Sequence, residues 1–253
     1  MKKIALITGA TSGIGKATTR ILAKNGYDVI ITGRRMELLD ELAKNIHNDT
    51  GAEVLKLQFD VRSLSQVEEA VDSLTGKWTN IDLLVNNAGL AVGLGPIHTG
   101  VTDDWDRMID TNVKGLLYVT RKITPGMVER RGGHIINISS IAGREAYPNG
   151  AAYCASKHAV QAITHAQRIE LLPFGIKVSS ICPGMVDTEF SLVRFKGDKE
   201  KADNVYKGLT PLYAEDIAET ILFMVTRPSH VNIDDILIMP TNQASARDYY
   251  REQ

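Results

Sequence analysis

The sequence predicts an α/β fold in which helices cover both faces of one doubly wound parallel sheet of about seven strands. Two observations carry this prediction. Short apolar segments alternate with longer amphipathic ones along the chain. Most of the short segments are rich in β-branched residues and apolar on both faces, which is typical of buried parallel strands. The expected strands are Ile4–Ile7, Val29–Thr32, Val54–Gln58, Leu83–Asn86, His134–Ile138, Lys177–Ile181 and Ile236–Met239.

Helical patterns occupy the intervening segments, for example Gly15–Asn25, Met36–Ile46 and Leu64–Leu74. Ser63 precedes the last of these as an N-cap, and Gly26 follows the first. Because crossovers in such sheets are right-handed, the loops at the carboxyl ends of the strands form the ligand face. We expect one domain over residues 1–253. Residues 184–209 depart from the alternation, as either a mobile substrate loop or a solvated helical hairpin.

The composition argues against several classes of protein. The chain has 253 residues, 43% of them hydrophobic, and a formal net charge of −1 with a pI of about 6.6. It lacks the basic excess that a general nucleic-acid or anionic-membrane binder needs. Cys154 and Cys182, the only cysteines, indicate a reducing compartment. The apolar N-terminal run stops at Thr8 and no segment reaches the ~20 apolar residues that span a bilayer, so we expect a soluble, cytoplasmic protein.

A glycine-rich turn follows the first expected strand and leads directly into a helix, with the sequence Thr8-Gly9-Ala10-Thr11-Ser12-Gly13-Ile14-Gly15. Glycines permit a tight turn and the close approach of a pyrophosphate, and the N–H groups at the start of the helix suit phosphate. In an alternating α/β chain this turn predicts a dinucleotide site on a Rossmann-type sheet. Its Gly-x3-Gly-x-Gly spacing departs from the general Gly-x-Gly-x2-Gly pattern.

Arg34 and Arg35 follow the second strand, near the place where an NAD site carries an acidic residue. Guanidinium groups suit a 2′-phosphate, so we expect NADP as the cofactor. The alternative is that both arginines are solvated at the start of a helix. Asp60, after the third strand, is positioned to accept a hydrogen bond from an adenine amino group. Asn86 and Asn87 more often brace adjacent loops than contact substrate.

Ser139 and Ser140 end the fifth strand, and Tyr153 and Lys157 lie four positions apart on the following helix. That spacing puts the phenol and the ammonium on one helix face. Because a phenol has a pKa of about 10, we expect Lys157 to lower the pKa of Tyr153. Alone, such a pair is usually a half-buried aromatic beside a snorkelling lysine. Together with Ser140 it predicts acid/base chemistry on an alcohol or ketone.

These motifs resemble those of the short-chain dehydrogenase/reductase family over essentially the whole chain, and the glycine spacing is the one that family uses. The resemblance implies that Tyr153 is the general acid/base, that Ser140 hydrogen-bonds the substrate oxygen, that Lys157 binds the nicotinamide ribose and that Asn112 anchors a water of a proton relay. From the residues alone, Asn112 reads instead as a local helix-kink residue. The positions expected to bind the cofactor are Gly9, Thr11, Ser12, Gly13, Ile14, Gly15, Arg34, Arg35, Asp60, Val61, Asn87, Ala88, Gly89, Tyr153, Lys157, Pro183 and Gly184.

A closer resemblance is to the NADP-dependent branch of this family that acts on serine, L-allo-threonine and 3-hydroxy acids. It is carried by Thr188–Ser191, Val193–Asp198 and Met239–Thr241. It implies an oxidoreductase whose substrate has a carboxylate. The candidate cations for that carboxylate are Arg194, Arg144 and Lys196, and each of them is alternatively a solvated surface charge.

Two other functions stay open at this point. One is an NADPH-dependent reductase of other ketones or diketones. The other is a non-catalytic dinucleotide-sensing protein, which has no need for Ser140, Tyr153, Lys157 and Asn112 together. The family resemblance also implies a homotetramer assembled through helices near 103–130 and 151–172, although burial within one subunit predicts a similar pattern. The scattered histidines predict no metal site.

Overall fold

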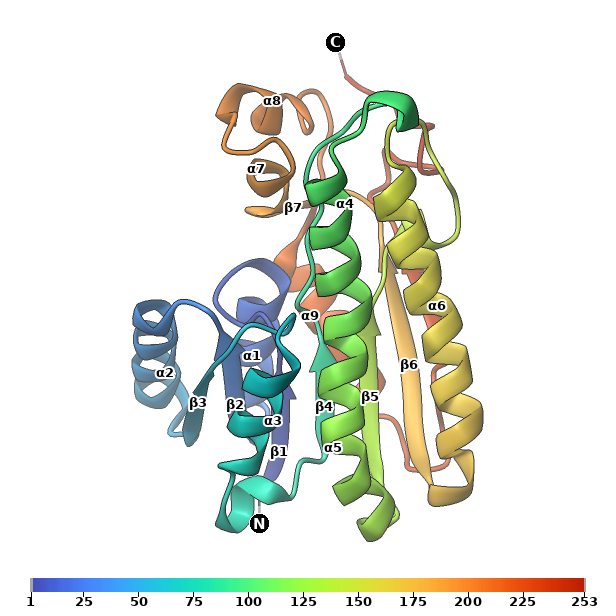
Figure 1. The fold of residues 1–253 in the computed structure, drawn as a ribbon. Helices are drawn as coiled ribbons and strands as arrows, with labels where there is room; N and C mark the ends of the chain where they lie inside the picture. The colour runs from blue at the N-terminus through green and yellow to red at the C-terminus, as the bar shows by residue number, and fades with distance from the viewer. Residues whose placement is uncertain (1, 253) are drawn as a thin grey trace.

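The computed structural model describes residues 2–252, which form a seven-stranded parallel sheet in the order β3-β2-β1-β4-β5-β6-β9 (Figure 1). The predicted fold class and all seven predicted strands are confirmed, and the strand ends differ from the expected ones by at most two residues. The strands are β1 (Lys3–Ile7), β2 (Tyr27–Gly33), β3 (Val54–Gln58), β4 (Leu83–Asn86), β5 (Gly133–Ile138), β6 (Ile176–Pro183) and β9 (Asp235–Ile238).

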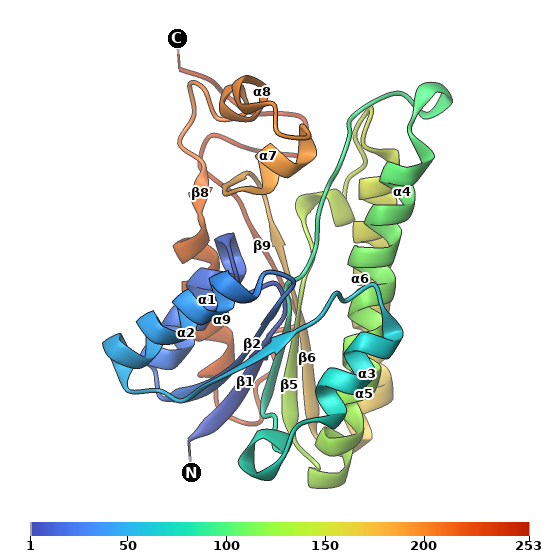
Figure 2. The ribbon, with the colours of Figure 1, turned by 60° about the vertical axis from the view of Figure 1, so that its left-hand side comes forward.

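Two layers of helices enclose the sheet, as Figure 2 shows. The helices of one layer are α1 (Gly13–Lys24), α2 (Met36–Thr50) and α9 (Ala214–Val225), and those of the other are α3 (Leu64–Asp72), α4 (Thr102–Ile109), α5 (Leu116–Arg130) and α6 (Ala151–Leu171). Successive residues of β1 point to opposite faces, so Ile7 joins the first apolar core and Leu6 joins the second. Burial of both faces explains why central strands such as β1, β2 and β4 read as continuous apolar runs.

The strand order reverses between β1 and β4. From β1 the chain proceeds outward to β2 and β3, and it then returns to β4 on the other side of β1. Loops that leave β1 and β4 therefore diverge, which opens a crevice at the carboxyl ends of these strands. The sheet places the ligand site at this position.

Residues 186–213, here named the cap segment, lie above the carboxyl ends of the strands (Figures 1 and 2). The segment contains β7 (Val186–Asp187), α7 (Phe190–Arg194), α8 (Lys199–Asn204) and β8 (Leu212–Tyr213), and β7 pairs with β8 in a second, two-stranded sheet. The segment contains two short helices, as the helical-hairpin interpretation expected, and the substrate-loop interpretation stays a prediction. The two short strands were not predicted, because two residues show no periodicity.

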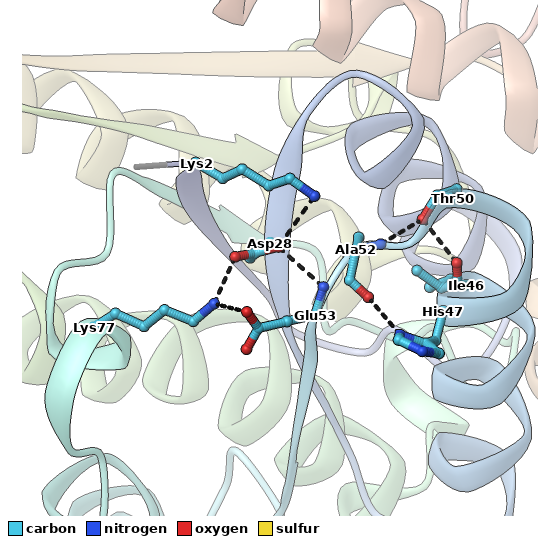
Figure 3. Close-up of polar contacts among 8 residues, drawn as sticks. All are labelled: Lys2, Asp28, Ile46, His47, Thr50, Ala52, Glu53 and Lys77. Atoms are coloured by element: carbon cyan, nitrogen blue, oxygen red, sulfur yellow. Dashed lines mark hydrogen bonds and ion pairs between the residues drawn. The ribbon is translucent and has the colours of Figure 1, made fainter.

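Charged residues around Asp28 connect the amino ends of β1, β2 and β3 (Figure 3). Asp28 on β2 is 5% exposed. Its carboxylate accepts hydrogen bonds from Lys77 Nζ at 2.7 Å and from the backbone N–H of Glu53 at 3.0 Å, and Lys2 lies 3.8 Å away. Burial raises the pKa of Asp28, but the bonds from Lys77 and Glu53 outweigh it and hold the pKa below its usual value.

We expect Asp28→Asn to lower the free energy of unfolding at pH 7 by about 2 kcal/mol, because two nearly buried charge-assisted hydrogen bonds are lost. A lowered pKa in the folded state stabilises the protein above the unfolded-state pKa of about 3.9. The difference between variant and wild type should therefore shrink as the pH falls from about 5 to about 2. Urea unfolding at several pH values measures the difference in the free energy of unfolding between the variant and the wild type. Asp40→Asn, which removes an exposed pair with Lys56, is the control and should cost less than about 0.5 kcal/mol; equal losses would contradict the prediction.

Candidate functional site

A cavity of about 390 Å³ lies at the reversal point of the strand order. Its wall is formed by the glycine-rich turn, the carboxyl ends of the strands, α6 and the cap segment. The predicted site residues that line it are Gly9, Thr11, Ser12, Gly13, Ile14, Arg34, Arg35, Asp60, Val61, Asn87, Ala88, Gly89, Ser140, Tyr153, Lys157, Pro183 and Gly184. Among the other predicted positions, Gly15, Asn112, Arg144, Arg194 and Lys196 do not line this cavity.

The glycine-rich turn leaves its backbone open at the start of α1. Gly9 has φ +65°, a conformation that favours glycine, and a Cβ on Gly15 would lie 2.3 Å from the carbonyl oxygen of Gly9. Asn87 Nδ2 donates to the carbonyls of Thr8 and Gly9 at 2.9 and 3.1 Å, which confirms its expected bracing role. The first N–H groups of α1 have no intrahelical acceptor and are oriented to bind an anion.

Two arginines line the far end of the cavity. Arg35 donates to Thr11 Oγ1 at 3.2 Å and lies 3.7 Å from Glu189, and Arg34 is 64% exposed and lies 4.0 Å from Asp60. Gly33 precedes the two arginines at the end of β2, and a Cβ there would lie 2.8 Å from Thr11 Cγ2, so this position has no room for a side chain without displacement. Asp60 is already engaged by Arg62 at 2.6 Å. The arrangement suits a ribose 2′-phosphate.

Ser140, Tyr153 and Lys157 converge at the other end of the cavity. Ser140 follows β5, and its Oγ accepts from the N–H of Ala142 at 3.1 Å. Tyr153 and Lys157 lie one turn apart on α6 and are 7% and 6% exposed. Lys157 Nζ donates to the carbonyl of Ile138 at 2.9 Å and lies 5.9 Å from the centroid of the Tyr153 ring. The three side chains thus meet from two elements, as the sequence predicted.

The pKa of Tyr153 differs from expectation. Burial raises it well above its usual value and the nearby Tyr147 raises it further, whereas Arg194 and Ser140 lower it only in part. Lys157 Nζ is held at the Ile138 carbonyl, 5.9 Å from the centroid of the Tyr153 ring, and burial outweighs the groups that lower the pKa of Tyr153. Burial also lowers the pKa of Lys157 to about 8. The residues of the chain by themselves therefore keep Tyr153 protonated at neutral pH.

Asn112 lies in η3 (Asp110–Gly115), a turn of π-helix between α4 and α5. Its Oδ1 accepts from the N–H of Leu90 at 2.8 Å, and its Nδ2 donates to the Leu90 carbonyl at 2.8 Å and to Ser156 Oγ at 3.0 Å. The amide therefore joins η3, the loop after β4 and α6, and it does not serve the local helix bond of the alternative reading. Single π-turns of this kind are frequent at functional sites.

Arg194 is the predicted cation that lies beside Tyr153. Its guanidinium carbon lies 5.0 Å from the centroid of the Tyr153 ring and 5.5 Å from that of Phe190, and its NH2 donates to the Tyr147 hydroxyl at 2.5 Å. Within residues 2–252, the buried Nε of Arg194 has no hydrogen-bond partner. One N–H group of this arginine thus has no partner among the described residues, and Arg194 lines the second cavity beside Tyr153.

The other two cations are engaged elsewhere. Lys196 Nζ lies 2.8 Å from Asp104 Oδ2, and Arg144 lies 2.5 Å from Asp235 Oδ1, where β9 begins. A second cavity of about 260 Å³ shares Tyr153 with the first and is lined also by Arg194 and Lys196. Arg144 lines neither cavity, so the structure does not bring it to the site.

Sequence reasoning missed several residues around Tyr153. The ring of Phe190 packs against Tyr153 with centroids 5.7 Å apart, Tyr147 holds Arg194, and Arg107 of α4 lines the first cavity. Phe190 lies within the stretch that carried the closer family resemblance, which was a usable signal. Tyr147 and Arg107 lie in a loop and on a helix face with no pattern that marks them.

The described residues contain neither a membrane-spanning helix nor a cluster of metal ligands. None of the helices placed between residues 2 and 252 is both long and apolar enough to cross a bilayer. In the same part of the chain, no three or more His, Cys, Asp or Glu side chains gather as a metal site.

Comparisons with known proteins agree with this geometry. The family model described as short chain dehydrogenase matches residues 3–198. NADP-dependent 3-hydroxy acid dehydrogenase YdfG of Salmonella typhi is 48% identical over 244 residues, which cover 96% of this chain and 97% of that protein. Sulfoacetaldehyde reductase 2 of Chromohalobacter salexigens is 43% identical, with 96% of each chain covered. A solved closed form of serine dehydrogenase complexed with NADP+ superposes with a TM-score of 0.92 and 45% identity, covering 99% of this chain and 100% of that one.

Proposed function

Because the chain belongs to the short chain dehydrogenase family, we propose that it is an NADP-dependent oxidoreductase acting on a small 3-hydroxy acid or 3-hydroxy amino acid. The observation that carries the substrate class is Arg194. Its guanidinium packs over the Tyr153 ring at 5.0 Å and its buried Nε is unpaired within the described residues. A carboxylate is the ligand that such a group recognises best.

Different residues along the first cavity are proposed to bind the different parts of NADP. The glycine-rich turn and the start of α1 would hold the pyrophosphate, Arg34 and Arg35 would hold the 2′-phosphate, and Asp60 and Val61 would face the adenine. Lys157 would hold the nicotinamide ribose. The remaining contacts come from Asn87, Ala88, Gly89, Pro183 and Gly184. Bound NADP supplies the acceptor, or in reduced form the donor, of the hydride.

The proton steps belong to Tyr153 and Ser140. In ketone reduction the Tyr153 hydroxyl gives its proton to the substrate oxygen, while Ser140 donates a hydrogen bond to that same oxygen. In alcohol oxidation Tyr153 accepts the proton instead and must first lose its own. Because the chain's own residues raise the pKa of Tyr153, oxidation should accelerate as the pH rises. Asn112 remains the proposed anchor of a relay water, next to Ser156 and the loop after β4.

The proposal also covers the oligomeric state and the cellular location of the protein. We propose a homotetramer assembled through α4–α5 and α6, supported by exposed Leu117, Ile169 and Leu172 on these elements and their ends, which are 41%, 62% and 72% exposed. A cytoplasmic location fits the buried free thiols of Cys154 and Cys182. Residues 1–253 then act as one catalytic and cofactor-binding domain.

The function is tested by NADP⁺ reduction at 340 nm with L-serine, L-allo-threonine, 3-hydroxyisobutyrate, 3-hydroxypropionate and a secondary alcohol without a carboxylate. Turnover of the acids in preference to the plain alcohol is the expected result. Turnover of the plain alcohol alone would favour a reductase of other ketones and would remove the carboxylate role of Arg194. Binding of NADPH without turnover of any substrate would favour the dinucleotide-sensing alternative.

Arg34→Ala is expected to raise KM for NADP⁺ about thirtyfold, because a charge-assisted bond to the 2′-phosphate is lost. KM for NAD⁺, which lacks that phosphate, should change little. Steady-state kinetics with both cofactors measures the ratio. Arg20→Ala removes an exposed arginine of α1 and controls for the change in net charge. An equal rise for both cofactors would place Arg34 outside the 2′-phosphate site.

A further inference from the structure

The chain just beyond Arg194 is fastened to α4. Lys196 Nζ lies 2.8 Å from Asp104 Oδ2, and Asp104 is 5% exposed. The carbonyl oxygen of Arg194 itself accepts a hydrogen bond from the N–H of Gly93 at 3.0 Å. Two independent contacts thus hold the end of α7 against the loop after β4 and the first turn of α4.

Lys196 occupies a position where glycine is the usual residue. It has φ +53° just after α7, and its N–H donates to Val193 while the N–H of Gly197 donates to Leu192. These two bonds define a Schellman end, whose left-handed position favours glycine. A lysine there costs backbone free energy. The lysine side chain is placed against the Asp104 carboxylate, which gives it a role at this position.

The loop after β4 is shaped around the same carboxylate. Gly93 has φ +71°, and a Cβ at this position would lie 2.5 Å from Asp104 Oδ2. A side chain at this position would displace the Asp104 carboxylate, and the left-handed φ also favours glycine. The carboxylate therefore lies between the glycine that bonds Arg194 and the lysine two residues beyond Arg194.

We propose that Asp104 is a positioning residue for substrate recognition. Through Lys196, and packed beneath Gly93, it fixes the end of α7 and so holds the Arg194 guanidinium beside Tyr153. Lys196 acts as the tether and does not bind the substrate carboxylate. The inference rests on the proposed function, in which Arg194 binds that carboxylate. Recognition of a small substrate depends on the placement of such groups to within a fraction of an ångström.

The test compares Asp104→Asn with Lys196→Gly. Each is expected to raise KM for 3-hydroxypropionate about fivefold to tenfold, a typical coupling between contacting residues. The kcat and the Kd of NADPH should stay near the wild-type values. Glycine at 196 relieves the left-handed strain, so a higher KM in that variant does not arise from a damaged helix end. Lys196→Arg keeps the charge and should keep the KM. Asp72→Asn, which removes an exposed pair with Lys122, is the matched control.

The double variant separates the tether from direct binding. With a tether, Asp104→Asn/Lys196→Gly raises KM no further than either single change, because both remove one interaction. If Lys196 itself bound the carboxylate, Asp104→Asn would release the lysine and lower KM while Lys196→Gly raised it. That opposite pair of results, or no change in either variant, would overturn the inference. Failure of the proposed function looks different: the wild type then shows no preference for acids, and Arg194→Met leaves KM unchanged.

Discussion

Tyr153→Phe is expected to reduce kcat about a thousandfold in both directions, because proton transfer by a positioned side chain contributes on that scale. The phenyl ring keeps its packing against Phe190, whose centroid lies 5.7 Å away, and its place beneath Arg194. The fold and the affinity for NADPH should therefore be preserved. Stopped-flow or steady-state absorbance at 340 nm measures kcat, and NADPH fluorescence measures the affinity for the cofactor.

Tyr27→Phe is the matched control for this change. Tyr27 is also buried, at 7% exposed, but it lies at the amino end of β2, and its loss should leave kcat unchanged. In the wild type, the kcat for oxidation should rise with pH, because burial raises the pKa of Tyr153 and oxidation needs its deprotonated form. Retention of more than about a tenth of the kcat in Tyr153→Phe would mean that another group transfers the proton.

Arg194→Met is expected to raise KM for 3-hydroxypropionate about a hundredfold, or about 2.8 kcal/mol. A loss of this size in binding free energy is typical when charge-assisted hydrogen bonds to a carboxylate are removed from a partly buried site. Methionine keeps much of the apolar contact with Tyr153 and Phe190, so the cap segment should stay folded. KM for a secondary alcohol without a carboxylate, and for NADP⁺, should not change. Steady-state kinetics with the three ligands provides the comparison.

Arg144→Met provides the decisive contrast. Arg144 was the third candidate cation in the sequence, but its guanidinium pairs with Asp235 and it lines neither cavity. Its replacement should leave KM for the acid within about threefold of wild type. A larger effect at Arg144 than at Arg194 would relocate the carboxylate site and would refute the substrate assignment made from the geometry.

Local sequence was sufficient for the strands and for the glycine-rich turn. Val54–Gln58 and Leu83–Asn86 were predicted with their observed bounds. Leu83–Asn86 is buried on both faces, which leaves a continuous apolar run. Val54–Gln58 is an edge strand in which Lys56 and Gln58 are exposed, and its β-branched and apolar residues still marked it. The turn was predictable because the close approach of Gly15 to the Gly9 carbonyl permits no other residue. The pairing of β7 with β8 was not predictable, since two residues in each strand carry no periodic signal.

The pKa of Tyr153 shows the limit of reasoning from spacing. The interval between Tyr153 and Lys157 correctly placed both on one face of α6, but it could not show that Lys157 turns to the Ile138 carbonyl. Nor could it show that burial outweighs the neighbouring charges. Desolvation depends on the whole surrounding shell of the protein, which no local pattern encodes.

The sequence by itself determined the order and kind of the elements, the position of the ligand face and the residue types that meet there. Hydrophobic period and turn chemistry are local properties, so they can be read along the chain. Only the tertiary structure decided which cation lies beside Tyr153. Arg194 reaches Tyr147 across 47 positions, whereas Arg144 is held by Asp235 across 91. Contacts over such separations are set by how the cap segment and β9 pack against the sheet, and that packing leaves no trace in the spacing of the arginines.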